Sequence, residues 1–544
     1  MGTRSQSVKE IASRITNNPL LIRRLTSLDV ACNEIEQYYH EYDYKDIQCN
    51  GFRTFVKIVD SFLIQLASLL CHADIDKNKL RDFDIFSQVL FKNAQVATMI
   101  RNKGHEYPLQ VTDADFEIVK EFAWIEPKHI EPLFGSIGPF YVKSGFQAAL
   151  KNILTAIGLF STTSIWDKIR FLLIPSSRTQ MSAYFMINFD LKNAIALRTT
   201  YQFPLNVLLN WFKQPVDCTA NWILMPRTLS EWRISLPDAK TSATIEKRER
   251  GEACDPPIKC FVYSPLPDVV PDTKSILLHI PGGAFFMCPA TADVTLMSKV
   301  CRDLGVSIVV PEYRTAPEDP FPAALQDVLD LYMFLTSRDQ KVLDVLGFYP
   351  EEIVLSGVSA GGLLAIVLTI ALNEIRRKGG EVTMPKALSL QCPAAIVGSI
   401  AYPGALLSGL DICAGIGQLR FSCLSYARTD PPVDFNDMDH EDLERWRKVI
   451  MRINDRLKDP LYNPTVYDKY EDMKDIHMCI LAGEMDTLMD HSIFIANKWK
   501  GRVTFDVGRG LPHGFTALSS EAAVREEVDT LIQRMAFILG TRGE

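Results

Sequence analysis

Short runs of consecutive apolar residues recur through the second half of the chain, separated by segments long enough for a helix. Because the runs are continuous rather than alternating, they are typical of strands covered on both faces, as in a parallel sheet flanked by helices. The pattern therefore predicts an α/β unit with a mostly parallel sheet. Seven such runs are present, at 258–265, 275–281, 306–313, 352–358, 387–395, 477–483 and 502–508.

Apolar residues in the first two hundred positions follow a helical spacing instead. From Phe55 to Leu70 they recur every three or four positions, which places them on one face of a helix. The stretches 145–160 and 184–203 are similarly apolar without alternation, and the second also admits a mixture of strand and helix. This half of the chain is therefore predicted to be mainly helical.

A polar, charge-dense stretch at 237–257 separates these two textures and is typical of a surface loop near a domain boundary. A chain of 544 residues is also too long for one ordinary core. We therefore expect a mainly helical domain over 1–235 and an α/β domain over 236–544, with a modest cap or insert over 402–467.

Composition removes several classes of function. The net charge of −8 and the absence of a basic block argue against a nucleic-acid partner. The longest uncharged run, 387–410, carries prolines and glycines that would break a lipid-facing helix, so no transmembrane span is expected.

The first residues lack the apolar core of a signal peptide, and the twelve cysteines are scattered, which predicts reduced thiols in the cytosol. No metal motif or dinucleotide fingerprint is visible, so neither a metal nor a cofactor is expected.

The segment 352–372 carries the clearest chemistry. A predicted strand runs through Gly357-Val358-Ser359-Ala360-Gly361 into an uninterrupted apolar helix. This is the G-x-S-x-G turn in the strand-to-helix context in which the central serine is a nucleophile. The glycines two residues away leave room where a side chain would clash, and the helix N-terminus adds N–H groups and a positive dipole end. Ser359 is thus the candidate nucleophile.

A serine nucleophile needs a base, and the base needs an orienting acid, in the chain order Ser, acid, His. Of the four histidines after Ser359, His513 lies in a loop broken by glycine and proline directly after a predicted strand, which favours it as the base. Asp486 follows another predicted strand and is the preferred acid. Glu484 and Asp490 lie on the same loop and remain alternatives.

Two adjacent glycines follow the predicted strand at 275–280 and can be interpreted in two ways. They are either a plain turn or a place where a developing negative charge approaches the backbone. Acyl transfer needs such a place, so we predict that the loop of Gly282, Gly283 and Ala284 forms an oxyanion hole. The N–H group of Ala360, next to the nucleophile, would be the other donor.

These motifs resemble a known family. The segments at 279–286 (HIPGGAFF), 311–325 (PEYRTAPEDPFPAAL), 357–362 (GVSAGG) and 511–515 (LPHGF) look like the hormone-sensitive lipase family of α/β-hydrolases. Two further segments, 42–62 and 133–161, resemble the extra N-terminal domain of the animal members.

The resemblance implies a serine hydrolase that cleaves lipid carboxylic esters such as acylglycerols and cholesteryl esters. It implies Ser359 as nucleophile, His513 as base and Asp486 as acid, with oxyanion donors from Gly283, Ala284 and Ala360. It also implies a place in the cytosol or at the lipid-droplet surface, allows a homodimer, and leaves lipid binding, partner binding or dimerisation as roles for the helical domain.

The chain departs from the family pattern at two positions. Pro281 stands where the loop usually begins with histidine, and Val358 stands where an aspartate usually precedes the nucleophile. His279 lies two residues too early to replace the missing histidine. We expect a working enzyme with a differently tuned loop, because proline also restricts the backbone.

One alternative is a protein with the same fold but without catalytic activity. Plant gibberellin receptors resemble this family but lack the triad histidine, so a non-catalytic or weakly catalytic ligand receptor is the competing hypothesis. The presence of His513 in an intact PHGF context argues against it. A four-residue kinase pattern at 23–26 (RRLT) also makes Thr26 a weak candidate for phosphorylation.

Overall fold

The computed structural model describes most of the chain. Its described residues are 3–72, 74–104, 112–113, 115, 117–118, 121, 124–147, 166, 169–170, 173–202, 217–227, 231–238, 241–249, 255–266, 274–398, 402–411, 414–428 and 453–541.

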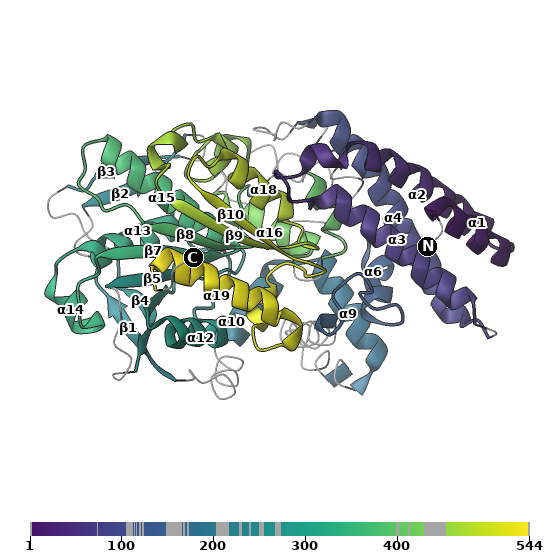
Figure 1. The fold of residues 1–544 in the computed structure, drawn as a ribbon, viewed down its shortest axis with the longest axis horizontal. Helices are drawn as coiled ribbons and strands as arrows, with labels where there is room; N and C mark the ends of the chain where they lie inside the picture. The colour runs from purple at the N-terminus through teal and green to yellow at the C-terminus, as the bar shows by residue number, and fades with distance from the viewer. Residues whose placement is uncertain are drawn as a thin grey trace.

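Most of the described helices in the first two hundred residues lie at one end of the molecule, drawn in purple and blue in Figure 1, whereas the last of them lies nearer its middle. Their bounds are α1 (Arg4–Arg14), α2 (Pro19–Tyr38), α3 (Gly51–Leu70), α4 (Lys77–Lys103), α6 (Pro127–Phe134), α9 (Pro175–Ile187) and α10 (Leu191–Gln202). The 3₁₀ helix η1 (Tyr39–Tyr42) joins two of them.

The helix predicted from Phe55 to Leu70 is confirmed as most of α3. Asn50 caps this helix, and its side-chain oxygen accepts a hydrogen bond from the Arg53 N–H. The stretch 184–203 contains the end of α9 and all of α10, with no strand among its described residues. Most of the stretch 145–160 lies outside the described residues.

An eight-stranded sheet forms the other part of the molecule, in the order β1-β4-β6-β5-β7-β8-β9-β10. The strands are β1 (Cys218–Met225), β4 (Ile258–Pro265), β5 (Ser275–Ile280), β6 (Ser307–Pro311), β7 (Glu352–Val358), β8 (Ala387–Gln391), β9 (His477–Gly483) and β10 (Val503–Gly508). The pairs β1–β4 and β4–β6 are antiparallel, and all the others are parallel. The prediction of a mostly parallel sheet with flanking helices is therefore confirmed.

Helices cover both faces of this sheet (Figure 1). Alternate residues of one strand point to opposite cores: Leu277 of β5 packs with α12 and α19, whereas Leu278 packs with α13 and α15. The first of these cores is continuous with the core of the N-terminal helices. The covering helices are α12 (Val294–Leu304), α13 (Ala323–Thr336), α15 (Ala360–Arg377), α18 (Met489–Lys498) and α19 (Arg525–Leu539). Two further helices are α14 (Gln340–Leu346) and the largely buried α16 (Ile416–Tyr426).

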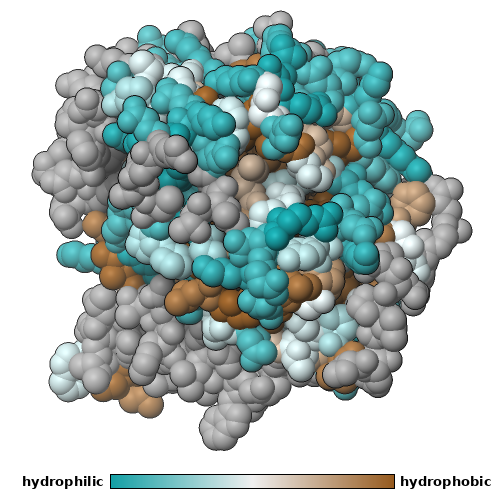
Figure 2. Space-filling model, turned by 90° about the vertical axis from the view of Figure 1, so that its left-hand side faces the viewer, coloured by the Kyte–Doolittle hydropathy of each residue, from teal (hydrophilic) through white to brown (hydrophobic). Residues whose placement is uncertain are grey.

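Each of the seven predicted strands is present, and three strands were not predicted. β1 is an edge strand in which Leu224 remains 66% exposed and only Met225 is buried, so it lacks the continuous burial of the central strands. β2 (Trp232–Ser235), just before the polar boundary stretch, and β3 (Thr244–Lys247), within it, form a separate small antiparallel sheet. Figure 2 shows the face on this side of the molecule, where apolar patches stand among mostly hydrophilic side chains.

The expected division of the chain stays a prediction, and β1 joins the sheet although it precedes residue 236. Within 402–467 the described residues form η2 (Pro403–Leu407), α16, and η3 (Pro464–Val466), while 429–452 lie outside the described residues. Three short 3₁₀ helices complete the chain: η4 (Tyr470–Met473), η5 (Phe515–Leu518) and η6 (Ala522–Val524). Among the described residues, no helix is long and apolar enough to cross a membrane.

Candidate active site

Ser359 lies at the sharp turn between β7 and α15. Its backbone adopts φ 53° and ψ −117°, a conformation that L-residues rarely hold. A Cβ on Gly357 would lie 2.3 Å from the Gly361 carbonyl oxygen, and a Cβ on Gly361 would lie 2.0 Å from the Ile280 carbonyl oxygen. Both glycines are therefore required by close backbone approach, as the motif predicts.

The structure brings the three predicted triad residues into one hydrogen-bonded chain. His513 Nε2 lies 2.9 Å from Ser359 Oγ, and His513 Nδ1 lies 2.9 Å from Asp486 Oδ1. Asp486 follows β9 and is fully buried, and His513 lies in the loop after β10 with 9% exposure. Parallel strands bring these loops together because their carboxyl ends share one edge of the sheet.

The two alternative acids have other partners. Glu484 forms ion pairs with Lys57 and Arg509. The carboxylate of Asp490 accepts a hydrogen bond from the Gly51 N–H at 3.1 Å. Asp486 is the carboxylate that the structure places against the His513 ring.

Asp411 is a polar residue of this site that sequence reasoning missed. Its Oδ2 accepts hydrogen bonds from the backbone N–H groups of Thr487, at 3.0 Å, and His513, at 3.3 Å. It thereby ties the acid loop to the base loop. No local motif marks it, because it lies 75 residues before Asp486 in a segment without regular spacing.

The electrostatics around His513 favour its protonated form. Burial acts to lower the pKa of this imidazole, but the hydrogen-bonded carboxylate of Asp486 and the nearby carboxylate of Asp411 outweigh it and raise the pKa above its ordinary value. A base with a raised pKa accepts a proton from a serine hydroxyl more readily.

The glycine loop after β5 lies directly beside the nucleophile. A Cβ on Gly282 would lie 3.0 Å from the Val358 carbonyl oxygen and 3.3 Å from Ser359 Cβ. Gly283 has φ 124°, and a Cβ there would lie 2.4 Å from the Met287 carbonyl oxygen, so this position requires glycine. The loop therefore approaches Ser359 as closely as its small residues allow.

Three N–H groups around Ser359 have no protein acceptor. Among the residues that the structure describes, the backbone N–H groups of Gly283, Ala284 and Ala360 donate to no acceptor. Ala360 is buried, and Ala284 has a positive φ of 52°. With no acceptor among the described residues, these donors are free to bind an oxygen of a ligand.

Pro281 is held in place by a neighbouring strand end. The Tyr313 hydroxyl donates to the Pro281 carbonyl at 2.9 Å and lies 3.4 Å from the Gly282 carbonyl. His279 does not reach the loop, because its ring is buried between Ser356 Oγ at 3.0 Å and Asp293 Oδ2 at 3.2 Å. Tyr313 thus holds the start of the glycine loop through its carbonyl groups.

Aromatic side chains gather on the far side of the glycine loop. Phe189, Phe286 and Phe421 have ring centroids 5.0–5.4 Å apart, and Ala284 and Met287 pack against them. Phe189 comes from the link between α9 and α10, so the N-terminal helices cover this side of the site. The cluster is a small apolar wall behind the glycine loop, against which Ala284 packs.

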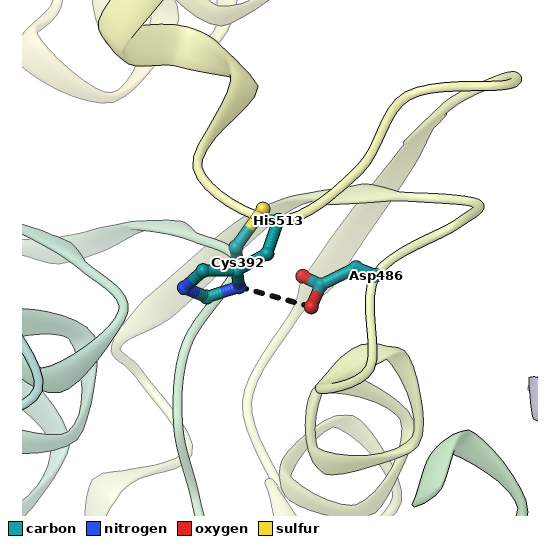
Figure 3. Close-up of side chains that lie close together, drawn as sticks. All are labelled: Cys392, Asp486 and His513. Atoms are coloured by element: carbon teal, nitrogen blue, oxygen red, sulfur yellow. Dashed lines mark hydrogen bonds and ion pairs between the residues drawn. The ribbon is translucent and has the colours of Figure 1, made fainter. Parts of the chain in front are cut away.

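Cys392 lies close enough to Asp486 and His513 for the three side chains to be considered as ligands of one metal ion. Figure 3 shows its side chain beside the hydrogen-bonded pair of His513 and Asp486, and the potential ligand atoms lie within 4.8 Å of one another. Burial raises the pKa of the Cys392 thiol well above its ordinary value, and the charge of Asp486 raises it further. A metal ion would have to displace the hydrogen bond between His513 and Asp486, so the arrangement fits proton transfer better.

Two family models match the chain. Residues 277–517 match the model of the α/β hydrolase fold. Residues 3–81 match the model of the hormone-sensitive lipase N-terminus. The sheet and the first helices thus have separate matches.

Individual relatives match shorter stretches. Mouse (Mus musculus) hormone-sensitive lipase is 30% identical over 172 residues, which are 32% of this chain and 22% of the mouse protein. Lipase 2 of Moraxella sp. is 35% identical over 263 residues, covering 45% of this chain and 56% of that protein. A thermostable esterase structure from Pseudomonas putida aligns over 64% of this chain and 91% of its own, with 13% identity and a TM-score of 0.46. The chain therefore covers about a fifth of the length of the mouse relative.

Proposed function

Because this chain belongs to the hormone-sensitive lipase family of α/β-hydrolases, we propose that it hydrolyses carboxylic esters of lipids through an acyl-enzyme on Ser359. The observation that carries the proposal is the hydrogen-bonded chain from Asp486 through His513 to Ser359. Its two distances of 2.9 Å are within the range for direct proton transfer.

In the first half-reaction, Ser359 Oγ attacks the ester carbonyl while His513 Nε2 takes the hydroxyl proton. Asp486 accepts the hydrogen bond of Nδ1–H and stabilises the imidazolium. The carbonyl oxygen gains negative charge and binds the free N–H groups of Gly283, Ala284 and Ala360. The bond to the alcohol then breaks, and His513 gives its proton to the departing alkoxide.

In the second half-reaction, water replaces the alcohol. His513 Nε2 takes a proton from the water as its oxygen attacks the acyl carbon, and the same N–H groups bind the second oxyanion. The bond to Ser359 Oγ breaks, the serine recovers its proton from His513, and the fatty acid leaves.

The apolar wall supports lipid esters as substrates. Phe189, Phe286 and Phe421 pack against the glycine loop, so the surroundings of the oxyanion donors are apolar on this side. Burial of apolar surface stabilises binding by about 25 cal/mol per Å², so a long acyl chain gains more than a short one. Acylglycerols and cholesteryl esters are the proposed substrates, and the cytosol or the lipid-droplet surface is the proposed location.

The decisive test is hydrolysis of a short chromogenic ester by the wild type and by Ser359→Ala, with Ser61→Ala on α3 as the matched control. We expect Ser359→Ala to lower kcat by at least about 10⁴-fold and Ser61→Ala to leave it unchanged. Equal rates for the wild type and Ser359→Ala would refute the assignment and favour a non-catalytic receptor. A panel of emulsified diacylglycerol, cholesteryl ester and short soluble esters would then define the preferred acyl chain and alcohol.

A further inference from the structure

The first two turns of α3 contact the loop that carries Asp486 on both sides of this residue. Gly51, Thr54 and Lys57 are spaced three apart, so they lie along one side of the helix. Their partners are Glu484, two residues before Asp486, and Asp490, four residues after it. These contacts join parts of the chain more than 400 residues apart.

At the start of α3, the helix N-terminus holds the carboxylate of Asp490. The Gly51 N–H donates to Asp490 Oδ2 at 3.1 Å, and the Gly404 N–H adds a second hydrogen bond. A Cβ on Gly51 would lie 2.1 Å from the Pro403 carbonyl carbon, so no side chain fits in this joint. The N-terminal helix, η2 and the start of α18 therefore pack backbone against backbone.

One turn further along, α3 holds Glu484. Thr54 Oγ1 donates to the Glu484 main-chain carbonyl at 2.8 Å in a buried hydrogen bond. Lys57 pairs with the Glu484 carboxylate, which also accepts from Arg509 at 3.0 Å and from the Gly510 N–H at 2.9 Å. Glu484 thereby connects α3 to the loop that leads to His513.

These contacts continue to the base. Asp411 follows η2 in the chain, and its carboxylate holds the N–H groups of Thr487 and His513. The packing of Gly51 against Pro403 and Gly404 sets the position of η2, and Glu484 sets the start of the acid loop. The contacts through η2 and Asp411 and the contacts through Glu484 therefore both position the residues of the Asp486–His513 hydrogen bond.

We propose that the first two turns of α3 brace the catalytic acid, with Thr54 and Lys57 as positioning residues that act through Glu484 on the Asp486–His513 hydrogen bond. This proposal rests on the proposed function, since it names the part that the helical domain plays in the same site. An error of 1 Å in the position of a catalytic group costs about 100-fold in rate, so a loop that relaxes by a fraction of this distance loses rate without losing substrate affinity.

The test uses the full-length chain and the substitutions Thr54→Val, Thr54→Ser and Lys57→Gln. Valine has nearly the shape of threonine and removes the donor, whereas serine keeps it. Thr26→Val is the matched control, because Thr26 bonds only within its own helix, to the Ile22 carbonyl. For each variant, kcat, KM, the pH profile of kcat/KM and the thermal midpoint are measured.

We expect Thr54→Val to lower kcat by about tenfold at unchanged KM, and Lys57→Gln by about threefold. In Thr54→Val, the acid limb of the kcat/KM pH profile should move to lower pH, because a displaced Asp486 no longer raises the pKa of His513 as far. Thr54→Ser should restore most of kcat, and Thr26→Val should match the wild type. If Thr54→Val only lowered the fraction of correctly folded enzyme, kcat would fall but the acid limb would stay in place, and that result would overturn the proposal. Wild-type kinetics in Thr54→Val would also overturn it.

A wild type without any esterase activity would refute the proposed function, and the brace is then judged by a different signal. The proton on His513 Nδ1, in its hydrogen bond to Asp486, is expected to give a downfield resonance in the proton NMR spectrum. If Thr54→Val shifts or broadens this resonance and Thr26→Val does not, the brace is supported. An unchanged resonance in Thr54→Val would overturn it.

Discussion

Asp490 gives the sharpest prediction for stability as a function of pH. Burial is the largest influence on this carboxyl group and raises its pKa from 3.8 to about 7, although the N–H groups of Gly51 and Gly404 oppose the change. A tenfold change in an ionisation constant corresponds to about 1.4 kcal/mol, so ionising Asp490 in the folded protein costs about 4 kcal/mol more than in the unfolded chain.

The sign of the effect follows from which state holds the proton. Between pH 3.8 and about 7, the folded protein keeps a proton on Asp490 that the unfolded chain has lost. The free energy of unfolding therefore falls as the pH rises through this window. Below it Asp490 makes no contribution, and above it the full penalty of about 4 kcal/mol applies.

The substitution Asp490→Asn removes this titration and keeps an oxygen that can accept from Gly51. We expect the free energy of unfolding of the variant, relative to the wild type, to rise by about 4 kcal/mol between pH 4 and pH 8. Urea unfolding followed by tryptophan fluorescence at several pH values measures this difference. Asp74→Asn, at an exposed carboxylate, is the control and should change stability by less than about 0.5 kcal/mol at every pH.

Parallel pH dependences for the wild type and Asp490→Asn would refute the reasoning. Such a result would mean that Asp490 is ionised in the folded protein at little cost, with the N–H groups of α3 and η2 sufficient to replace its hydration.

Three further predictions concern the site. Asp486→Asn should lower kcat on a soluble ester by about 10⁴-fold, because the amide cannot stabilise the imidazolium of His513; a loss of less than tenfold would remove Asp486 as the acid. The value of kcat/KM should rise with pH as His513 loses its proton, with a midpoint above the ordinary histidine pKa of 6.5. Asp411→Asn should move that midpoint to lower pH, because the carboxylate of Asp411 raises the pKa of His513; an unmoved midpoint would show that Asp411 has no influence on the base. Pro281→His should change kcat by less than about tenfold, because the loop is already held by hydrogen bonds to its carbonyl groups; a gain of orders of magnitude would show that the native loop is impaired.

The sequence predicted the parts of the molecule that depend on neighbouring residues. Continuous apolar runs predicted the strands with buried faces, because a strand covered on both sides needs apolar residues at most positions. Glycines two residues from Ser359 predicted the turn, because no side chain fits so close to another backbone. The edge strand β1 was missed because its first half carries polar residues and only Met225 of it is buried. The other edge strand, β10, was predicted from its sequence although only Gly508 of it is buried.

The identity of the acid illustrates the limit of this reasoning. Glu484, Asp486 and Asp490 lie within seven residues of one another, and the sequence favoured Asp486 but left the other two as alternatives. In the structure each carboxylate has a different partner: Lys57 and Arg509 for Glu484, His513 for Asp486, and the start of α3 for Asp490. The choice depends on elements that are distant in the chain.

Local sequence alone therefore predicted seven of the strands and the tight turn at Ser359, because these depend on burial and backbone room within a few residues. The order of serine, acid and histidine followed from the fold that the turn motif indicates. Only the tertiary structure decided which carboxylate faces His513, that Asp411 joins the acid and base loops, and that α3 contacts the acid loop. These features are hydrogen bonds between residues 27 to more than 400 positions apart, and they exist only once the helices and the sheet have packed together.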